Sequence, residues 1–188
     1  MNEPPALDNS EFARYQPWLK LLARLQWDSR YQSKFDPSDV VQQTMMEAWK
    51  AAPQFRGESE GERLAWLRQI LSHVLAHEFR RYRGTQKRDA DREVSIEQTL
   101  AQSSSRLGDL LAGGEATPSQ CAMRREQELQ VADVLERLPE DYREVIVLRN
   151  LEDLPHEEVA RRMGRSPAAV RMLWVRALRA LREQLTGE

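Results

Sequence analysis

A stop and restart of helical signals near the C-terminus constrains the fold of this chain more than any other feature. Gly164 follows Met163, at a place where a helix commonly ends in a left-handed residue. Ser166 can cap a new helix, and Pro167 suits the first position of that helix because its missing N–H costs no hydrogen bond there. These signals predict two short helices that meet at a tight turn, a helix-turn-helix.

The spacing of apolar residues supports both helices of this pair. The first is expected over residues 155–163, with Val159 and Met163 facing inward and Ala160 allowing close helix approach. The second is expected from Pro167 to about Leu185. Its predicted core positions are Val170, Trp174, Ala177 and either Leu181 or Leu178, and its opposite side carries Arg171, Arg176, Arg179 and Arg182.

The rest of the chain also predicts helices. Asp36 and Pro37 form a helix start, and an apolar face follows over residues 41–52. A helix around residues 18–27 precedes it, a longer one follows from Leu64 to Tyr82, and further helices are expected over 119–138 and 140–151. Glycine is scarce, at 8 residues, which argues against an all-β chain rich in tight turns.

The apolar pattern weakens in the middle of the chain. Residues 84–118 hold a charge run, a serine run and Gly113-Gly114, and predict a mostly flexible linker with a short helix near residues 106–111. We therefore expect an all-α fold of two small helical domains joined by a flexible linker, the C-terminal domain containing the helix-turn-helix. The expected boundaries are 1–84, 85–118 and 119–188.

Composition excludes several classes of protein. No apolar run approaches the roughly 20 residues of a membrane span, and the N-terminus lacks the features of a secretory signal. A single cysteine permits no internal disulfide. The sequence therefore predicts a cytoplasmic protein.

No recognisable catalytic or cofactor motif is present, so we expect neither an enzyme nor a cofactor. His73 and His77 are spaced to share a helix face, but Val74 stands where the zincin pattern needs Glu, and no metal site is expected.

Charge is segregated along the chain although the net charge is only −2. Residues 140–160 hold seven acids against two arginines, whereas residues 161–182 hold seven arginines and no acid. A second basic cluster comprises Arg80, Arg81, Arg83, Lys87, Arg88 and Arg92. Two basic patches suggest two local contacts with a polyanion, and the alternative is that both patches are solvated helix faces. For the helix-turn-helix, the alternative is a plain antiparallel helix pair in a bundle.

Several motifs resemble those of sigma factors of the extracytoplasmic-function (ECF) type. Residues 138–149 (LPEDYREVIVLR) and the pattern over 157–177 resemble the C-terminal promoter-binding domain, domain four. Residues 39–49 resemble the polymerase-binding helix of domain two, and residues 66–70 with Arg80-Arg81 resemble its minus-ten melting helix. The run RMLWVRAL at 171–178 is most similar to the planctomycete-type subgroup.

The resemblance implies a sigma factor that binds core RNA polymerase and promoter DNA, with an anti-sigma factor as a further partner. It implies minus-thirty-five contacts at Ser166, Pro167, Ala168, Ala169, Arg171, Met172, Val175 and Arg176. It implies minus-ten contacts at Trp66, Gln69, His73, His77, Arg80 and Arg81, helped by the loop Phe55–Glu62. Polymerase contacts are implied at Asp39, Val40, Gln42, Gln43 and Met46.

The chain departs from the family pattern at a few positions. His73 and His77 stand where Asn and Asp are common, and Leu173 and Leu178 stand where arginines are common, so we expect an altered promoter preference. The alternative function is a helix-turn-helix repressor or activator with a helical N-terminal domain. That alternative accounts for the C-terminal region but not for residues 39–49 or 66–81.

Overall fold

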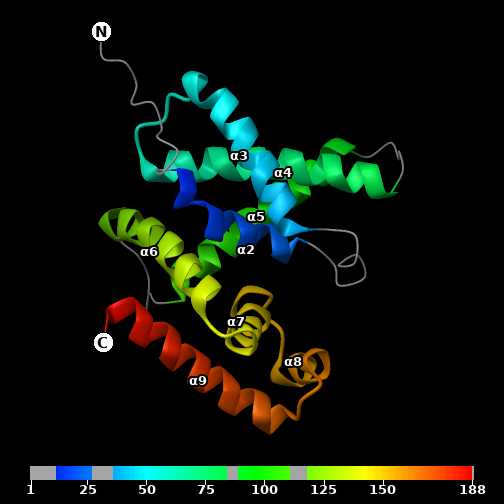
Figure 1. The fold of residues 1–188 in the computed structure, drawn as a ribbon, viewed down its shortest axis with the longest axis vertical. Helices are drawn as coiled ribbons and strands as arrows, with labels where there is room; N and C mark the ends of the chain where they lie inside the picture. The colour runs from blue at the N-terminus through cyan, green and yellow to red at the C-terminus, as the bar shows by residue number, and fades with distance from the viewer. Residues whose placement is uncertain (1–11, 27–35, 84–88, 111–117, 188) are drawn as a thin grey trace. The chain divides into compact units, whose positions relative to one another are not determined.

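The computed structural model describes residues 12–26, 36–83, 89–110 and 118–187, without the side chains of 82–94 and 118–124. Every regular element in these ranges is a helix (Figure 1). This confirms the predicted all-α fold. None of the described helices combines the length and apolar character needed to cross a bilayer. The chain divides into two compact units, residues 1–104 and 105–188.

The N-terminal unit is built around three helices that contact one another: α2 (Gln16–Leu25), α3 (Pro37–Ala51) and α4 (Glu60–Arg83). The 3-10 turn η2 (Ala52–Gln54) ends α3. Each helix sends large apolar side chains into one core, and burial of one such side chain contributes about 1.5 to 3 kcal/mol. The core includes Trp18, Leu19, Leu22, Val41, Ala48, Leu64, Leu67, Leu71 and Leu75.

Helix α3 begins as its sequence predicts. The Asp36 side chain accepts a hydrogen bond from the Ser38 N–H at 2.8 Å, and Pro37 occupies the first helical position. Further along, the buried Thr44 hydroxyl donates to the Val40 carbonyl at 2.8 Å, which satisfies a polar group inside the core. Local capping chemistry therefore fixes where the helix starts.

The middle of the chain differs from the predicted flexible linker with one short helix. Residues Asp89–Asp109 form helix α5, which buries Ile96, Leu100 and Leu107. In the N-terminal unit, Arg68 Nη1 donates to the Ser104 hydroxyl at 3.0 Å, and Ser104 is itself buried. The serine run that suggested flexibility is thus part of a packed helix, and the boundary between the two compact units falls inside that helix.

The C-terminal unit contains α6 (Pro118–Arg137), α7 (Glu140–Ile146), the π-helical turn η3 (Val147–Leu151), α8 (His156–Met163) and α9 (Pro167–Thr186). Helix α9 packs on α6, α7 and α8 (Figure 1). Its buried side chains are Val170, Leu173, Ala177 and Leu181. Three of these positions match the predicted core face. Leu173 takes the place expected for Trp174, whose side chain is only half-buried.

The turn between α8 and α9 has the geometry that the sequence predicts. Gly164 ends α8 in the left-handed region at φ +62°, and the Arg165 N–H donates to the Ala160 carbonyl at 2.9 Å. The Ser166 hydroxyl accepts from the Ala169 N–H at 3.2 Å, and Pro167 begins α9. Because a side chain would be strained at that φ, glycine fixes the turn that aims α9. The helix-turn-helix prediction is confirmed.

Candidate nucleic-acid interface

The side of α9 opposite its core forms the first candidate surface. Every residue that the sequence assigns to duplex contact is exposed there. Met172 and Val175 are 61% and 55% exposed, which is unusual for apolar side chains in a packed unit. We call this surface the reading face; it comprises Ser166, Pro167, Ala168, Ala169, Arg171, Met172, Val175 and Arg176.

Two arginines flank the apolar centre of the reading face. Arg171 and Arg176 diverge by about 140° around the helix axis, because a helix turns about 100° per residue. Arg171 Nη2 lies 3.4 Å from Glu157 Oε1 on α8, whereas Arg176 Nε donates to the Met172 carbonyl at 3.3 Å. Within the described part of the chain Arg176 has no carboxylate partner. The two arginines therefore differ electrostatically.

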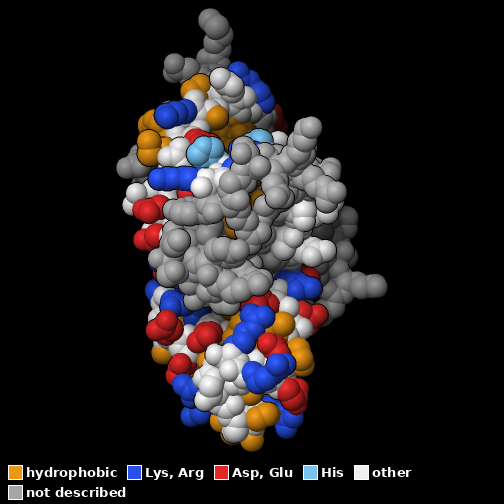
Figure 2. All heavy atoms as spheres, turned by 90° about the vertical axis from the view of Figure 1, so that its right-hand side faces the viewer, with side chains coloured by type: hydrophobic (Ala, Val, Ile, Leu, Met, Phe, Trp, Pro, Cys, Tyr) orange, Lys and Arg blue, Asp and Glu red, His pale blue; other side chains and the backbone are white. Residues whose placement is uncertain are grey.

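The acidic and basic segments that are separate in the sequence meet in space. Carboxylates of residues 141–158 pair with arginines of residues 161–171 within the C-terminal unit. The pairs are Arg161–Glu158, Arg162–Glu152, Arg165–Asp141 and Arg171–Glu157. On the face drawn in Figure 2, acidic and basic side chains accordingly alternate over the C-terminal unit. The acid-free stretch of sequence is thus not an acid-free surface.

An aromatic cluster that the sequence did not reveal fixes α9 against the preceding turn. Trp174 Nε1 donates to Asn150 Oδ1 at 2.9 Å, and the His156 ring meets the indole edge-on at 5.6 Å between centroids. The Arg149 guanidinium lies 5.8 Å from the Trp174 ring centroid. Burial, followed by the charges of Arg149 and Arg171, lowers the pKa of His156. Trp174 thus positions the reading helix rather than filling the core alone.

The second candidate surface runs along α4. Because α4 continues unbroken over 24 residues, the predicted minus-ten residues Trp66, Gln69, His73, His77, Arg80 and Arg81 lie on one side of it. Trp66 and Arg80 are half-buried and the other four are exposed. We call this set the α4 stripe. The side chains of Arg83, Lys87, Arg88 and Arg92 from the predicted basic cluster lie outside the described residues.

The loop before α4 places a second aromatic ring at one end of the α4 stripe. The Phe55 ring stacks on Trp66, with centroids 4.7 Å apart and planes 28° apart. Ser59 and Glu62 then form a reciprocal cap. The Ser59 N–H donates to Glu62 Oε2 at 2.9 Å, and the Glu62 N–H donates to Ser59 Oγ at 3.3 Å. A preceding loop, and not the helix alone, thus completes the aromatic surface.

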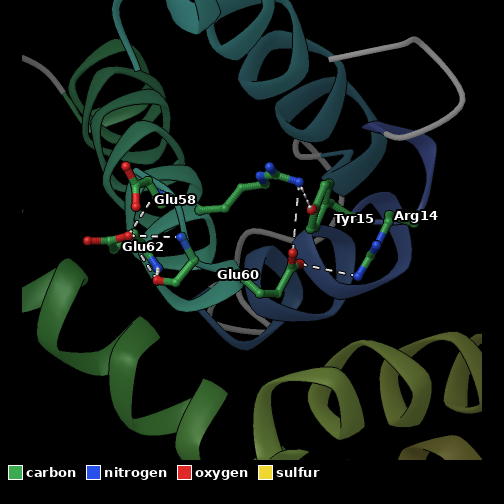
Figure 3. A network of polar contacts seen from close by, with 7 residues as sticks. Arg14, Tyr15, Glu58, Glu60 and Glu62 are labelled. Atoms are coloured by element: carbon green, nitrogen blue, oxygen red, sulfur yellow. Dashed lines mark hydrogen bonds and ion pairs between the residues drawn. The ribbon is translucent and has the colours of Figure 1, made fainter. Parts of the chain in front are cut away.

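A polar network anchors the start of α4 to the segment before α2 (Figure 3). Arg63 Nη1 donates to the buried Tyr15 hydroxyl at 3.2 Å, and Glu60 accepts from Arg14 at 3.3 Å. Burial raises the pKa of Tyr15, so its hydroxyl stays protonated at neutral pH. These contacts, together with the cap at Ser59, hold the Phe55 loop against the helical core.

A groove of about 510 Å³ between α3 and α4 brings two predicted sets together. Asp39 and Gln43 of the predicted polymerase set line it with His73, His77 and Arg81 of the α4 stripe. Asp36, Glu47 and Glu78 add carboxylates to the lining. No group of three or more potential metal ligands is arranged to hold an ion within the described residues. The histidine end of the α4 stripe therefore faces four carboxylates, those of Asp36, Asp39, Glu47 and Glu78.

The exposed side of α3 differs from the sequence prediction at two positions. Val40 was expected to contact a partner, but it is only 3% exposed, because it packs into the core beside Val41. Trp49, which the prediction of contact residues omitted, is 55% exposed and lies near Met46, which is 53% exposed. We call the exposed set Asp39, Gln42, Gln43, Met46 and Trp49 the α3 face.

Two protein-family models match the chain. Sigma-70 region 2 matches residues 12–85, which include α2, α3 and α4, and Sigma-70 region 4 matches residues 128–181, which include the reading face. A solved structure, the flagellar sigma/anti-sigma complex Sigma-28/FlgM, is similar over 94% of both chains with 17% identity and a TM-score of 0.33.

Curated relatives cover most of the chain. The ECF RNA polymerase sigma-E factor of Escherichia coli (strain K12) is 31% identical over 153 residues, which is 81% of this chain and 75% of that protein. The sigma-E factor of Haemophilus influenzae is 31% identical over 149 residues, which is 79% of this chain and 74% of that protein. With both helical regions matched in order, this chain belongs to the ECF branch of the sigma-70 family.

Proposed function

We propose how this sigma factor divides its work among the surfaces described above. As a member of its family, the chain binds core RNA polymerase and directs transcription initiation at promoter DNA. We propose that the reading face binds the minus-thirty-five element as double-stranded DNA. We propose that the α4 stripe with the Phe55 loop holds the minus-ten strand, and that the α3 face binds polymerase.

The geometry of the reading face supports contact with duplex DNA. Its N-terminal turn is exposed, contains the small residues Ala168 and Ala169, and is fixed by the Gly164 turn. A helix with these properties can enter the major groove, where its first turns meet base edges. Arginines on both sides of Met172 and Val175 can reach bases or phosphates.

The Phe55–Trp66 stack supports the proposal for single-strand contact. Stacking of one base on an aromatic side chain contributes about 1 to 3 kcal/mol, and the ring pair offers such a surface. Arg80 at the far end of the α4 stripe can contact phosphate. His73, His77 and Arg81 of the α4 stripe also line the acidic groove, whose carboxylates weaken the attraction of that end for a phosphate backbone.

The α3 face supports the proposal for polymerase contact. Exposed Met46 and Trp49 form an apolar centre with polar Gln42 and Gln43 beside it, which is the usual anatomy of a protein interface. Val40 is left out because it is buried, and Trp49 is added.

The domain boundaries 1–84 and 119–188, with a connecting segment at 85–118, remain our proposal for the two functional domains. The two matched family regions support it, because residues 86–127 lie outside both. We also propose that the chain acts in the cytoplasm with polymerase, catalyses no reaction itself, and is open to control by an anti-sigma factor. Membership of the planctomycete-type subgroup is proposed on residues 171–178 (RMLWVRAL).

Reconstitution tests the proposed function. The purified chain is mixed with core RNA polymerase and a library of promoter fragments, and transcripts are sequenced. We expect start sites that depend on the chain and share two elements at a fixed spacing. Stable binding to core polymerase separates a sigma factor from a helix-turn-helix repressor, which binds DNA without it. Failure to bind core polymerase would overturn the proposal.

A further inference from the structure

One ion pair joins the two helices of the helix-turn-helix at the edge of the reading face. Arg171 Nη2 of α9 donates to Glu157 Oε1 of α8 at 3.4 Å, and their side chains are 58% and 64% exposed. Exposed ion pairs contribute little to folding. The pair therefore has no large role in stability. Its main effect is on the charge and the orientation of the Arg171 guanidinium.

Glu157 lowers the attraction of Arg171 for phosphate in two ways. Its carboxylate offsets the guanidinium charge, and it repels any phosphate that approaches Arg171. Phosphate contacts carry no sequence information, so a weaker pull on phosphate reduces binding to all DNA alike. A guanine edge, by contrast, is recognised by the geometry of hydrogen bonds.

The pair leaves Arg171 able to read a base. A guanidinium has five N–H donors, and the contact to Glu157 involves one nitrogen, so enough donors remain for two parallel bonds to guanine. The contact also limits the orientations that the guanidinium samples. Glu157 itself is held at the first turn of α8, where the helix dipole favours a carboxylate.

Arg176 provides the contrast on the same helix. It has no carboxylate partner within the described residues and is therefore the stronger attractor of phosphate. We propose that Glu157 is a specificity-determining positioning residue: it restrains Arg171 so that this arginine favours a base edge over phosphate, and it thereby widens the affinity difference between promoter and non-promoter DNA. The inference rests on the proposed function of the reading face.

The test compares Glu157→Gln with Glu183→Gln. Glu183 pairs with Arg179 on α9 at 2.7 Å and lies outside the reading face, so both variants remove one negative charge and one arginine partner. Holoenzyme made with each full chain is bound to a promoter fragment and to the same fragment with a scrambled minus-thirty-five element. Affinity is measured at several salt concentrations.

For Glu157→Gln we expect affinity for the scrambled fragment to rise by up to about fivefold, the upper limit for an exposed pair. Affinity for the promoter should rise less, so the ratio of the two affinities falls. The plot of log affinity against log salt should steepen by up to about 0.9, the value for one added phosphate contact. Glu183→Gln should leave the affinity ratio as in the wild type.

A double variant checks that Glu157 acts through Arg171. In an Arg171→Ala background, Glu157→Gln should no longer change the affinity ratio. An unchanged ratio in the single Glu157→Gln variant, or a ratio that still changes without Arg171, overturns the inference. A wild-type holoenzyme with no preference for the promoter overturns the proposed function as well, so the two failures are distinguishable.

Discussion

Gly57 lies so close to the ring of Phe55 that a Cβ at this position would stand 2.3 Å from Phe55 Cζ. The contact is far inside van der Waals distance, and Phe55 cannot retreat without leaving its stack on Trp66. The missing side chain at residue 57 therefore allows the loop to fold back and place both rings together.

We predict that Gly57→Ala weakens promoter opening. Displacing Phe55 should remove part of a stacking surface and cost about 1 to 3 kcal/mol in the open complex. Permanganate reactivity of minus-ten thymines reports the opening, and binding to core polymerase serves as the control because the α3 face is untouched. In a Phe55→Leu background, Gly57→Ala should cause little further loss of promoter opening. Wild-type permanganate reactivity in Gly57→Ala would show that promoter opening does not depend on the Phe55–Trp66 stack.

We predict that Gln42→Lys and Met46→Lys weaken binding to core polymerase. A cation introduced at the centre of a protein interface should cost about 2 kcal/mol, roughly thirtyfold in affinity. Gln98→Lys, at an exposed position of α5, is the matched control. Circular dichroism should stay unchanged in all three variants, and equal affinities for Gln42→Lys and Gln98→Lys would move the interface elsewhere.

We predict different defects for the two arginines of the reading face. Arg171→Ala should relax sequence preference at one position of the minus-thirty-five element by about 1 to 3 kcal/mol. Arg176→Ala should weaken binding to all sequences alike and reduce the slope of log affinity against log salt by about 0.9. Binding to single-base promoter variants at several salt concentrations distinguishes them. If both variants retain wild-type affinity and preference, α9 is not the reading helix.

We predict that His156 makes the C-terminal unit less stable in acid. Its pKa is lowered by burial and by Arg149 and Arg171, with Glu157 opposing, so the unfolded chain binds protons more readily than the folded one. Its contribution to stability is present above the unfolded pKa of about 6.5 and is lost as pH falls through the folded pKa.

Denaturation of the wild type and of His156→Gln between pH 8 and pH 5 measures this contribution. The difference between the two proteins should shrink as the pH falls. Burial raises the pKa of Glu144, whose stabilising contribution is therefore lost as pH rises through its folded pKa. That effect is common to both proteins and cancels in the difference. A pH-independent difference would contradict the prediction.

We predict that Leu173→Ala destabilises the C-terminal unit far more than Leu178→Ala. Leu173 is 5% exposed, and removing such a side chain should cost about 2 to 4 kcal/mol, whereas half-buried Leu178 should cost about 1 kcal/mol. Urea denaturation of both variants provides the measurement. Equal losses would mean that Leu178, not Leu173 alone, belongs to the core.

Local signals predicted the helix-turn-helix well because their chemistry is local. Gly164, Ser166 and Pro167 each act within one helical turn, and the structure shows all three in the expected roles. Helix α5 was missed for the opposite reason. Its apolar positions are sparse among polar residues, and it depends on tertiary contacts such as Arg68 to Ser104.

Surface assignments were harder to predict than helices. Val40 and Trp49 are both apolar and lie on one helix, and only packing against α2 and α4 determines that Val40 is buried and Trp49 exposed. Likewise, the Arg171–Glu157 pair joins two helices whose approach depends on the turn at Gly164. Spacing along the chain cannot reveal such contacts.

The arginine–carboxylate pairs of the C-terminal unit have a kinetic consequence. Residues 105–188 carry 13 arginines against 15 acidic residues, so the unit as a whole projects no positive field beyond the Debye length of about 10 Å at moderate salt. Long-range attraction that accelerates encounters with DNA requires a net positive potential. We therefore expect the isolated C-terminal region to meet DNA at an ordinary, weakly salt-dependent rate, so that the search for promoters is driven by the polymerase that carries it.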